Sequence, residues 1–340
     1  MHYDVGMSSV SQAKRYSRGF PLLVVVIILI LVIGLTGGWY IYRRQHKGST
    51  STSTPTNLTG HVWIFTKGAF DAVIKDPIAA SRLRHDTIYL IAGAPVAGYN
   101  IIPTIDFHDE TQLARDISSR ASYVKAVLYD NEDDSKTPKK QRINFAYYYK
   151  LAGQMAHQDG LQLVATPALN LTESLDPSAD LGVGSPPATP AMLAAYLSDD
   201  IAYNTAKYSN VIDIQSQGLT QESGVLSNFV QQASAQAKSA NPNVTVLAGL
   251  STCAGFPTNG QQLASAAEAT APYVSGWWMN IPAASGDIPN CEANQTHVNY
   301  AIGAIYSLPS SWYSAQPSAP KANTGSNTCV RRCHRHATKR

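Results

Sequence analysis

Two carboxylates separated by a single residue, Asp130 and Glu132, give the strongest chemical signal in the sequence. Residues two positions apart point to the same face of a strand, so the two side chains would lie together. A neighbouring negative charge raises the pKa of one carboxyl group, so a protonated Glu132 beside an ionised Asp130 would act as a general acid with an orienting partner. The alternative is that residues 130–134 form a solvated acidic loop or cap the following helix.

A second polar series alternates along the chain at Asp213, Gln215 and Gln217. Alternate residues of a strand share a face, so these side chains form a polar row, which must be hydrogen-bonded if it is buried. The row is therefore either a structural network or a ligand site. Because an amide group both donates and accepts hydrogen bonds, Gln215, Gln217 and Asn170 are suited to bind sugar hydroxyls, with Asp213 beside them.

Two adjacent tryptophans, Trp277 and Trp278, point to opposite faces of a predicted strand, so at most one of them lines a site. An indole ring that faces a site can stack on a sugar ring. Trp278 and Asn280 therefore form a candidate binding pair. The alternative is that both tryptophans belong to the hydrophobic core.

The candidate side chains follow short apolar runs that alternate with helix-like stretches, as in a parallel sheet covered by helices. Eight runs are predicted to be strands: 61–66, 87–92, 101–106, 125–130, 162–166, 211–215, 244–249 and 274–280. Eight such units match an α/β fold of the (β/α)8 TIM-like barrel type, whose functional face lies at the C-terminal ends of the strands. The alternative is an open doubly wound sheet, if the third run is not a strand.

Signals for bound groups are weak. No Gly-rich phosphate-binding fingerprint follows the first run, so we expect no dinucleotide or other cofactor. The basic tail contains Cys329, Cys333, His334 and His336, but their spacing is irregular, so we expect no metal site.

The triplet Asp130, Asn131 and Glu132 at the end of the fourth predicted strand resembles the end of the family-18 glycoside hydrolase signature, D-x-x-D-x-D-x-E. The resemblance implies that Glu132 is the proton donor and that Asp130 orients the acetamido group of the substrate. A Trp near the end of the eighth strand recurs in that family and in this sequence. Lys125 and Leu128 stand at the two earlier acidic positions of the signature.

The body of the chain also resembles uncharacterised extracellular barrel-like proteins of soil bacteria, which carry similar Tyr-Asp-x-Glu and Asp-Ile-Gln-x-Gln strands. That resemblance implies no activity. We expect a barrel that acts on glycans, as a glycoside hydrolase with Glu132 as its general acid. The alternatives are a non-catalytic barrel that binds cell-envelope carbohydrate or a protein partner, and a structural surface protein.

Charge is distributed unevenly along the 340 residues. The whole chain has a net charge of +3, but residues 61–308 contain 14 Lys/Arg and 22 Asp/Glu, a net charge of −8. The basic excess therefore lies at the two ends. An acidic body argues against a nucleic-acid-binding core.

Residues 19–42 carry no charged side chain. A predominantly apolar stretch of about 20 residues spans a bilayer core of about 30 Å. A cleaved signal peptide is the alternative, but its apolar region would be only about 7–15 residues long. We therefore predict a transmembrane helix that anchors the chain in the lipid bilayer.

Basic residues flank this span on both sides, so the positive-inside rule does not orient it. The Ser/Thr-rich linker over 43–60 and the cysteine-bearing body favour an oxidising exterior. We therefore predict a single-pass protein of the cell membrane. It would have a cytoplasmic tail over 1–18, an extracellular barrel domain over 61–308 and a disordered basic tail over 309–340.

Cys253 and Cys291 follow the seventh and eighth predicted strands, which are neighbours in a barrel. Adjacent strands lie about 4.8 Å apart, and the Cα atoms of a disulfide lie about 4.4–6.8 Å apart. We predict that the two cysteines form a disulfide between two loops at the functional face. The alternative is two free thiols.

Overall fold

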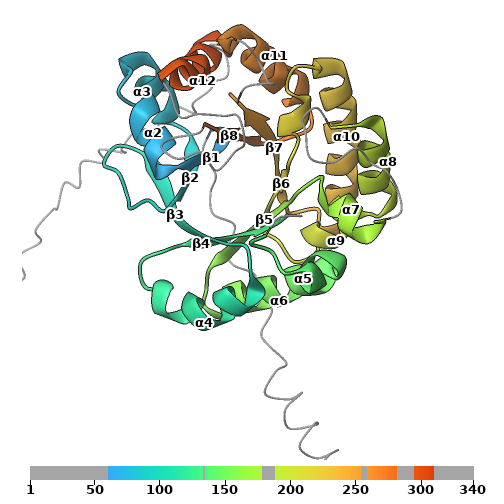
Figure 1. Cartoon of the computed structure of the whole chain (residues 1–340). Helices are drawn as coiled ribbons and strands as arrows, with labels where there is room; N and C mark the ends of the chain where they lie inside the picture. Colours follow the sequence, from blue (N-terminus) through green and yellow to red (C-terminus); the bar gives the residue numbers. More distant parts are fainter. Residues whose placement is uncertain (1–59, 133–134, 178–187, 254–258, 282–294, 310–340) are drawn as a thin grey trace, which may run out of the picture. The chain divides into compact units, whose positions relative to one another are not determined.

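The computed structural model describes residues 60–132, 135–177, 188–253, 259–281 and 295–309. Within these ranges eight parallel strands pair in sequence order, and β1 pairs with β8, which closes the sheet into a barrel (Figure 1). The strands are β1 (Val62–Thr66), β2 (Thr87–Ile91), β3 (Asn100–Phe107), β4 (Ala126–Asn131), β5 (Gln162–Pro167), β6 (Val211–Ile214), β7 (Thr245–Ser251) and β8 (Gly276–Asn280). The prediction of a TIM barrel is confirmed, and the third predicted strand pairs with both of its neighbours.

Helices surround the barrel (Figure 1). They are α2 (Lys67–Val73), α3 (Pro77–Leu83), α4 (Glu110–Arg120), α5 (Lys139–Ile143), α6 (Phe145–Gln158), α7 (Leu171–Leu175), α8 (Pro190–Ser198), α9 (Ile201–Ala206), α10 (Ser223–Ala240), α11 (Gly260–Thr270) and α12 (Gln295–Ser307), with the 3-10 turn η1 (Gln217–Leu219) after β6. Most strands are thus followed by at least one helix, the arrangement that places the strand ends at one face of a barrel.

Alternate residues of each strand point to opposite sides of the barrel wall. One set fills the interior and includes Ile64 on β1, Leu128 on β4 and Trp278 on β8. The other set packs against the helices and includes Trp277, whose indole Nε1 donates a hydrogen bond of 2.9 Å to the hydroxyl of Thr270. The two adjacent tryptophans therefore have different surroundings, one inside the barrel and one outside it.

A buried carboxylate stabilises the opposite, N-terminal end of the barrel. Asp86, just before β2, accepts hydrogen bonds from the backbone N–H of His61 at 3.0 Å and from the indole of Trp63 at 2.8 Å. Burial raises the pKa of Asp86 to about 6, although both hydrogen bonds oppose this shift. With each carboxylate oxygen paired, this group has a structural role.

Several predictions concern residues that the structure does not describe. The predicted cytoplasmic tail over 1–18, the span over 19–42, the linker up to residue 59, Cys291 and the tail from residue 310 all lie outside the described ranges. Among the helices that are described, none combines the length and the apolar character needed to span a bilayer.

Candidate functional site

Strand β4 carries the two candidate carboxylates to the C-terminal end of the barrel. Leu128 lies in the interior, and Asp130 follows it on the same side of the strand. Asp130 is only 7% exposed, whereas Glu132, just beyond the end of β4, is half-buried. The backbone N–H of Glu132 donates to the hydroxyl of Thr137 at 3.4 Å, which holds the chain where it leaves the strand. The strand therefore presents one buried and one accessible carboxylate.

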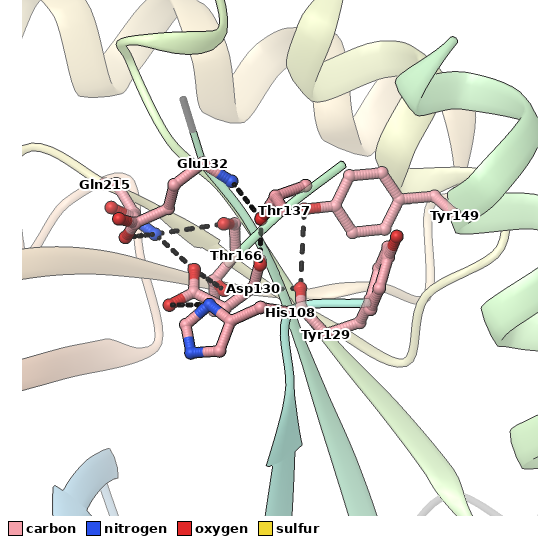
Figure 2. A network of polar contacts seen from close by, with 8 residues as sticks. All are labelled: His108, Tyr129, Asp130, Glu132, Thr137, Tyr149, Thr166 and Gln215. Carbon is pink, nitrogen blue, oxygen red and sulfur yellow. Dashed lines mark hydrogen bonds and ion pairs between the residues drawn. The ribbon is translucent and has the colours of Figure 1, made fainter. Parts of the chain in front are cut away.

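Gln215 connects the two carboxylates (Figure 2). Its side-chain Nε2 donates to Oδ1 of Asp130 at 2.7 Å, to Oε1 of Glu132 at 3.3 Å and to the backbone carbonyl of Thr166 at 3.0 Å. Gln215 follows β6 directly, so one amide group joins the ends of β4, β5 and β6. The structure thus brings together three of the residues that the sequence analysis selected.

Two further side chains contact Asp130 and were not among the sequence candidates. The hydroxyl of Thr166, on β5, donates to Oδ1 of Asp130 at 2.6 Å. Nδ1 of His108, just after β3, lies 3.8 Å from the other carboxylate oxygen, Oδ2 (Figure 2). A single Thr or His at the end of a strand forms no pattern in the sequence. Only the register of β3, β4 and β5 places these two residues beside Asp130.

Burial and neighbouring charge both act on Asp130. Desolvation raises the pKa of this carboxyl group well above its usual value, and the negative charge of Glu132 raises it further. The carboxylates of Asp106 and Asp213 add to the increase, while the hydrogen bond from Thr166 opposes it. Burial therefore favours the neutral form of Asp130. The role of Glu132 as the general acid stays a prediction.

Asp213 and Asp106 extend the acidic character of this face. Asp213, on β6, is 0% exposed and lies two residues after Val211, which faces the barrel interior. Asp106, on β3, lies four residues after the interior Ile102 but is exposed to solvent. Solvent therefore reaches an inward-facing side chain at the end of β3, but it does not reach Asp213 on the opposite side of β4 and β5.

The remaining predicted binding residues lie at strand ends of the same face. Gln217 begins η1, and its amide lies against Gly249 on β7. Gly249 pairs with Trp278 on β8. Asn280, the last residue of β8, is half-buried. Gln217 and Trp278 therefore flank the same glycine.

Asn170 and Cys253 lie in loops that follow strands. Asn170 is half-buried in the turn between β5 and α7. Cys253 is buried two residues after β7. Because Cys291 lies outside the described residues, the disulfide between Cys253 and Cys291 stays a prediction. Across the described ranges, no three His, Cys, Asp or Glu side chains are arranged to hold a metal ion.

Comparison with known proteins identifies only the fold. No protein-family model and no curated protein matches the chain. Solved structures that resemble it include triosephosphate isomerase from Bartonella henselae, at 12% identity and a TM-score of 0.39 over 73% of this chain and 98% of the other. A chitinase from Chromobacterium violaceum shares 10% identity, with a TM-score of 0.41 over 73% of this chain and all of the other. A sugar phosphate isomerase/epimerase from Parabacteroides distasonis shares 9% identity, with a TM-score of 0.38 over 76% and 96%.

Proposed function

We propose that this protein hydrolyses glycans at the C-terminal face of its barrel, with Glu132 as the general acid and Asp130 orienting the substrate. The observation that supports this most directly is the amide of Gln215, which donates to both carboxylates at once. It keeps an accessible Glu132 beside a buried Asp130. Two carboxyl groups in different environments can take different roles, such as a general acid and its orienting partner.

Substrate binding would change the protonation of this pair. In the ligand-free protein, burial favours the neutral form of Asp130, which is the more buried of the two groups. A sugar ring above Glu132 would remove water from its carboxylate and favour its neutral form as well. The proton would then be shared between two buried carboxyl groups, and Glu132 is the one that reaches the glycosidic oxygen. Around this pair, Gln217, Asn170 and Asn280 would bind hydroxyl groups and Trp278 would stack on a ring.

A second candidate is a non-catalytic barrel that binds carbohydrate. It is favoured by Leu128, which is buried in the barrel interior at a position where the family-18 signature has an acid. Lys125 replaces another acid of that signature. A protein of this kind would bind glycans at the same face without cleaving them.

Turnover by the Glu132→Gln variant separates the two candidates. The full chain is incubated with chitin-like and peptidoglycan-like oligosaccharides, and the products are measured by mass spectrometry. Loss of a general acid lowers the rate by about 10²–10⁴-fold, while oligosaccharide affinity should change little. Glu268→Gln, on the exposed side of α11, is the matched control and should retain the wild-type rate. Unchanged turnover in Glu132→Gln would contradict the role of Glu132, and a wild-type protein that binds without turnover would support the second candidate.

We also propose that residues 19–42 anchor the protein in the cell membrane with the barrel outside. The uncharged span, the Ser/Thr-rich linker that follows it and the low charge content of 14% support this arrangement. An external barrel would meet the glycans of the cell envelope directly.

A further inference from the structure

The two carboxylate oxygens of Asp130 have different surroundings. Oδ1 accepts hydrogen bonds from the hydroxyl of Thr166 at 2.6 Å and from the amide of Gln215 at 2.7 Å. Oδ2 accepts no hydrogen bond from the described residues, and it faces Nδ1 of His108 at 3.8 Å (Figure 2). One oxygen of this buried carboxylate is therefore held by two donors, while the other lies beside an imidazole.

The imidazole of His108 lacks a partner at the same place. Its Nδ1 is buried and forms no hydrogen bond within the described part of the chain. A separation of 3.8 Å is within ion-pair range but too long for a hydrogen bond. A buried polar atom without a partner costs free energy, so Nδ1 and the Oδ2 atom that it faces complement each other. Only the doubly protonated ring brings both a donor at Nδ1 and a positive charge.

The charges that raise the pKa of Asp130 are all negative. They are the carboxylates of Glu132 on β4, Asp106 on β3 and Asp213 on β6, and their effect adds to that of burial. Each of these charges disfavours an ionised Asp130. A cation beside Oδ2 would act in the opposite direction.

The two acids that follow His108 in the chain are engaged elsewhere. The amide of Gln141 donates to Oδ1 of Asp109 at 2.6 Å, and its carbonyl accepts from the backbone N–H of Glu110 at 2.9 Å. The charges of Asp109 and Glu110 act on Tyr129, whose ring packs on the helix side of β4. His108 is thus left to the acidic group inside the barrel.

We propose that His108 is a positioning residue for Asp130: its imidazolium pairs with Oδ2, keeps Asp130 ionised and so leaves the proton of the carboxyl pair on Glu132. This inference rests on the proposed function, because Asp130 needs to be ionised only if it accepts a donor group of the substrate. An opposite charge within about 4–6 Å favours the charged form of a carboxyl group. The imidazolium thereby offsets burial, which favours the neutral form of Asp130.

The pairing is tested without a substrate. Diethyl pyrocarbonate modifies the neutral imidazole, and mass spectrometry of peptides from the full chain gives the rate at each histidine as a function of pH. The side chain of His108 is 22% exposed, so the reagent can reach it. In Asp130→Asn, the pH of half-maximal reaction at His108 should be about one unit lower than in wild type, because the imidazolium loses its counter-charge. His85, exposed at the opposite end of the barrel, should react identically in both proteins.

Turnover tests the consequence for the site. His108→Asn keeps a nitrogen donor near the position of Nδ1 but cannot carry a positive charge. Where the wild-type imidazole is charged, the variant should turn over oligosaccharides about 10–100-fold more slowly, the usual effect of a hydrogen bond to a charged group. The two rates should converge as pH rises, because wild-type His108 then loses its charge as well. His85→Asn is the matched control and should retain the wild-type rate at every pH.

Two results would contradict the inference. An unchanged pH dependence of His108 in Asp130→Asn would exclude the ion pair, and a constant ratio between the His108→Asn and wild-type rates at every pH would indicate a purely structural role. These results are distinct from failure of the proposed hydrolase. Turnover together with an unchanged pH dependence of His108 would keep the hydrolase and reject the role of His108. A lower pH of half-maximal reaction in Asp130→Asn, without turnover of any oligosaccharide by the wild-type protein, would reject the hydrolase and keep the ion pair.

Discussion

The side-chain amide of Gln217 occupies the space that a Cβ atom at Gly249 would need. Such an atom would lie 2.6 Å from Cδ of Gln217 and 2.7 Å from its Nε2. Gly249 therefore allows the amide to lie over β7, next to the strand that carries Trp278. The glycine at this position shapes the candidate site without contacting a ligand.

We expect Gly249→Ala to displace Gln217 while the barrel stays folded, because the atoms that must move are the far end of a flexible side chain. Glycan affinity should fall severalfold, and the midpoint of thermal unfolding should change little. Gly276→Ala is the contrasting control, since a Cβ atom there would lie 1.8 Å from the backbone oxygen of Val62 and would destabilise the barrel. A Gly249→Ala protein with lower stability and unchanged glycan affinity would contradict the role of Gln217 in glycan binding.

Asp213 should make stability depend on pH. Burial raises the pKa of Asp213 well above 3.8, so the folded state binds a proton that the unfolded chain has released. The stabilisation is complete below pH 3.8 and is lost as pH rises through the folded-state pKa. Relative to wild type, the free energy of unfolding of Asp213→Asn should therefore increase as pH rises above about 4. Urea unfolding of both proteins at several pH values measures this difference. If the two free energies of unfolding change equally with pH, the effect of Asp213 is excluded.

The two adjacent tryptophans should respond differently to substitution. Trp277→Phe removes the buried hydrogen bond to Thr270 and should lower the free energy of unfolding by about 1–3 kcal/mol, because the hydroxyl loses its donor. Trp278→Phe keeps an aromatic ring inside the barrel and should mainly weaken glycan binding. Urea unfolding measures the stability of both variants, and titration with glycan measures their affinity. A larger loss of glycan affinity in Trp277→Phe than in Trp278→Phe would contradict a binding role for Trp278.

The predicted disulfide can be tested by peptide mapping of the exported protein without reduction. We expect one peptide pair linking Cys253 to Cys291, and a lower unfolding temperature after reduction. Closing a loop between residues 38 positions apart would stabilise the fold by roughly 3–4 kcal/mol. Quantitative alkylation of both cysteines in unreduced protein would exclude the bridge.

The predicted anchor can be tested by alkaline carbonate extraction of membranes. The intact chain should remain with the membrane, and deletion of residues 19–42 should release it. Protease added to intact cells should cleave the linker over 43–60 if the barrel lies outside. Release of the intact chain by carbonate would contradict a membrane-spanning helix.

Strand–helix alternation was enough to predict the barrel, because each strand is a short apolar run of distinctive composition. Asp130, Glu132 and Gln215 could also be selected, since each follows an apolar run and lies at a strand end. His108 and Gly249 could not be selected in this way. His108 matters only because the register of β3 places it beside Asp130, and Gly249 only because η1 folds Gln217 over β7.

The different surroundings of Asp130 and Glu132 also become visible only in the three-dimensional structure. In the sequence Asp130 and Glu132 are equivalent acids, two residues apart. The end of β4 lies between them, so one carboxylate remains inside the barrel and the other reaches solvent. That difference in burial raises the pKa of Asp130, and the spacing of the two residues in the sequence does not reveal it.

The ladder between β1 and β8 has a consequence for how the chain folds. It pairs Val62 with Gly276, so the ring cannot close until nearly the whole described chain has been synthesised. Pairing between distant segments is slow compared with local helix formation. Until it occurs, β1 and β7 remain open edges that can join to another chain. We therefore expect closure by β8 to be the late step of folding, and chains that stop before β8 to aggregate during synthesis.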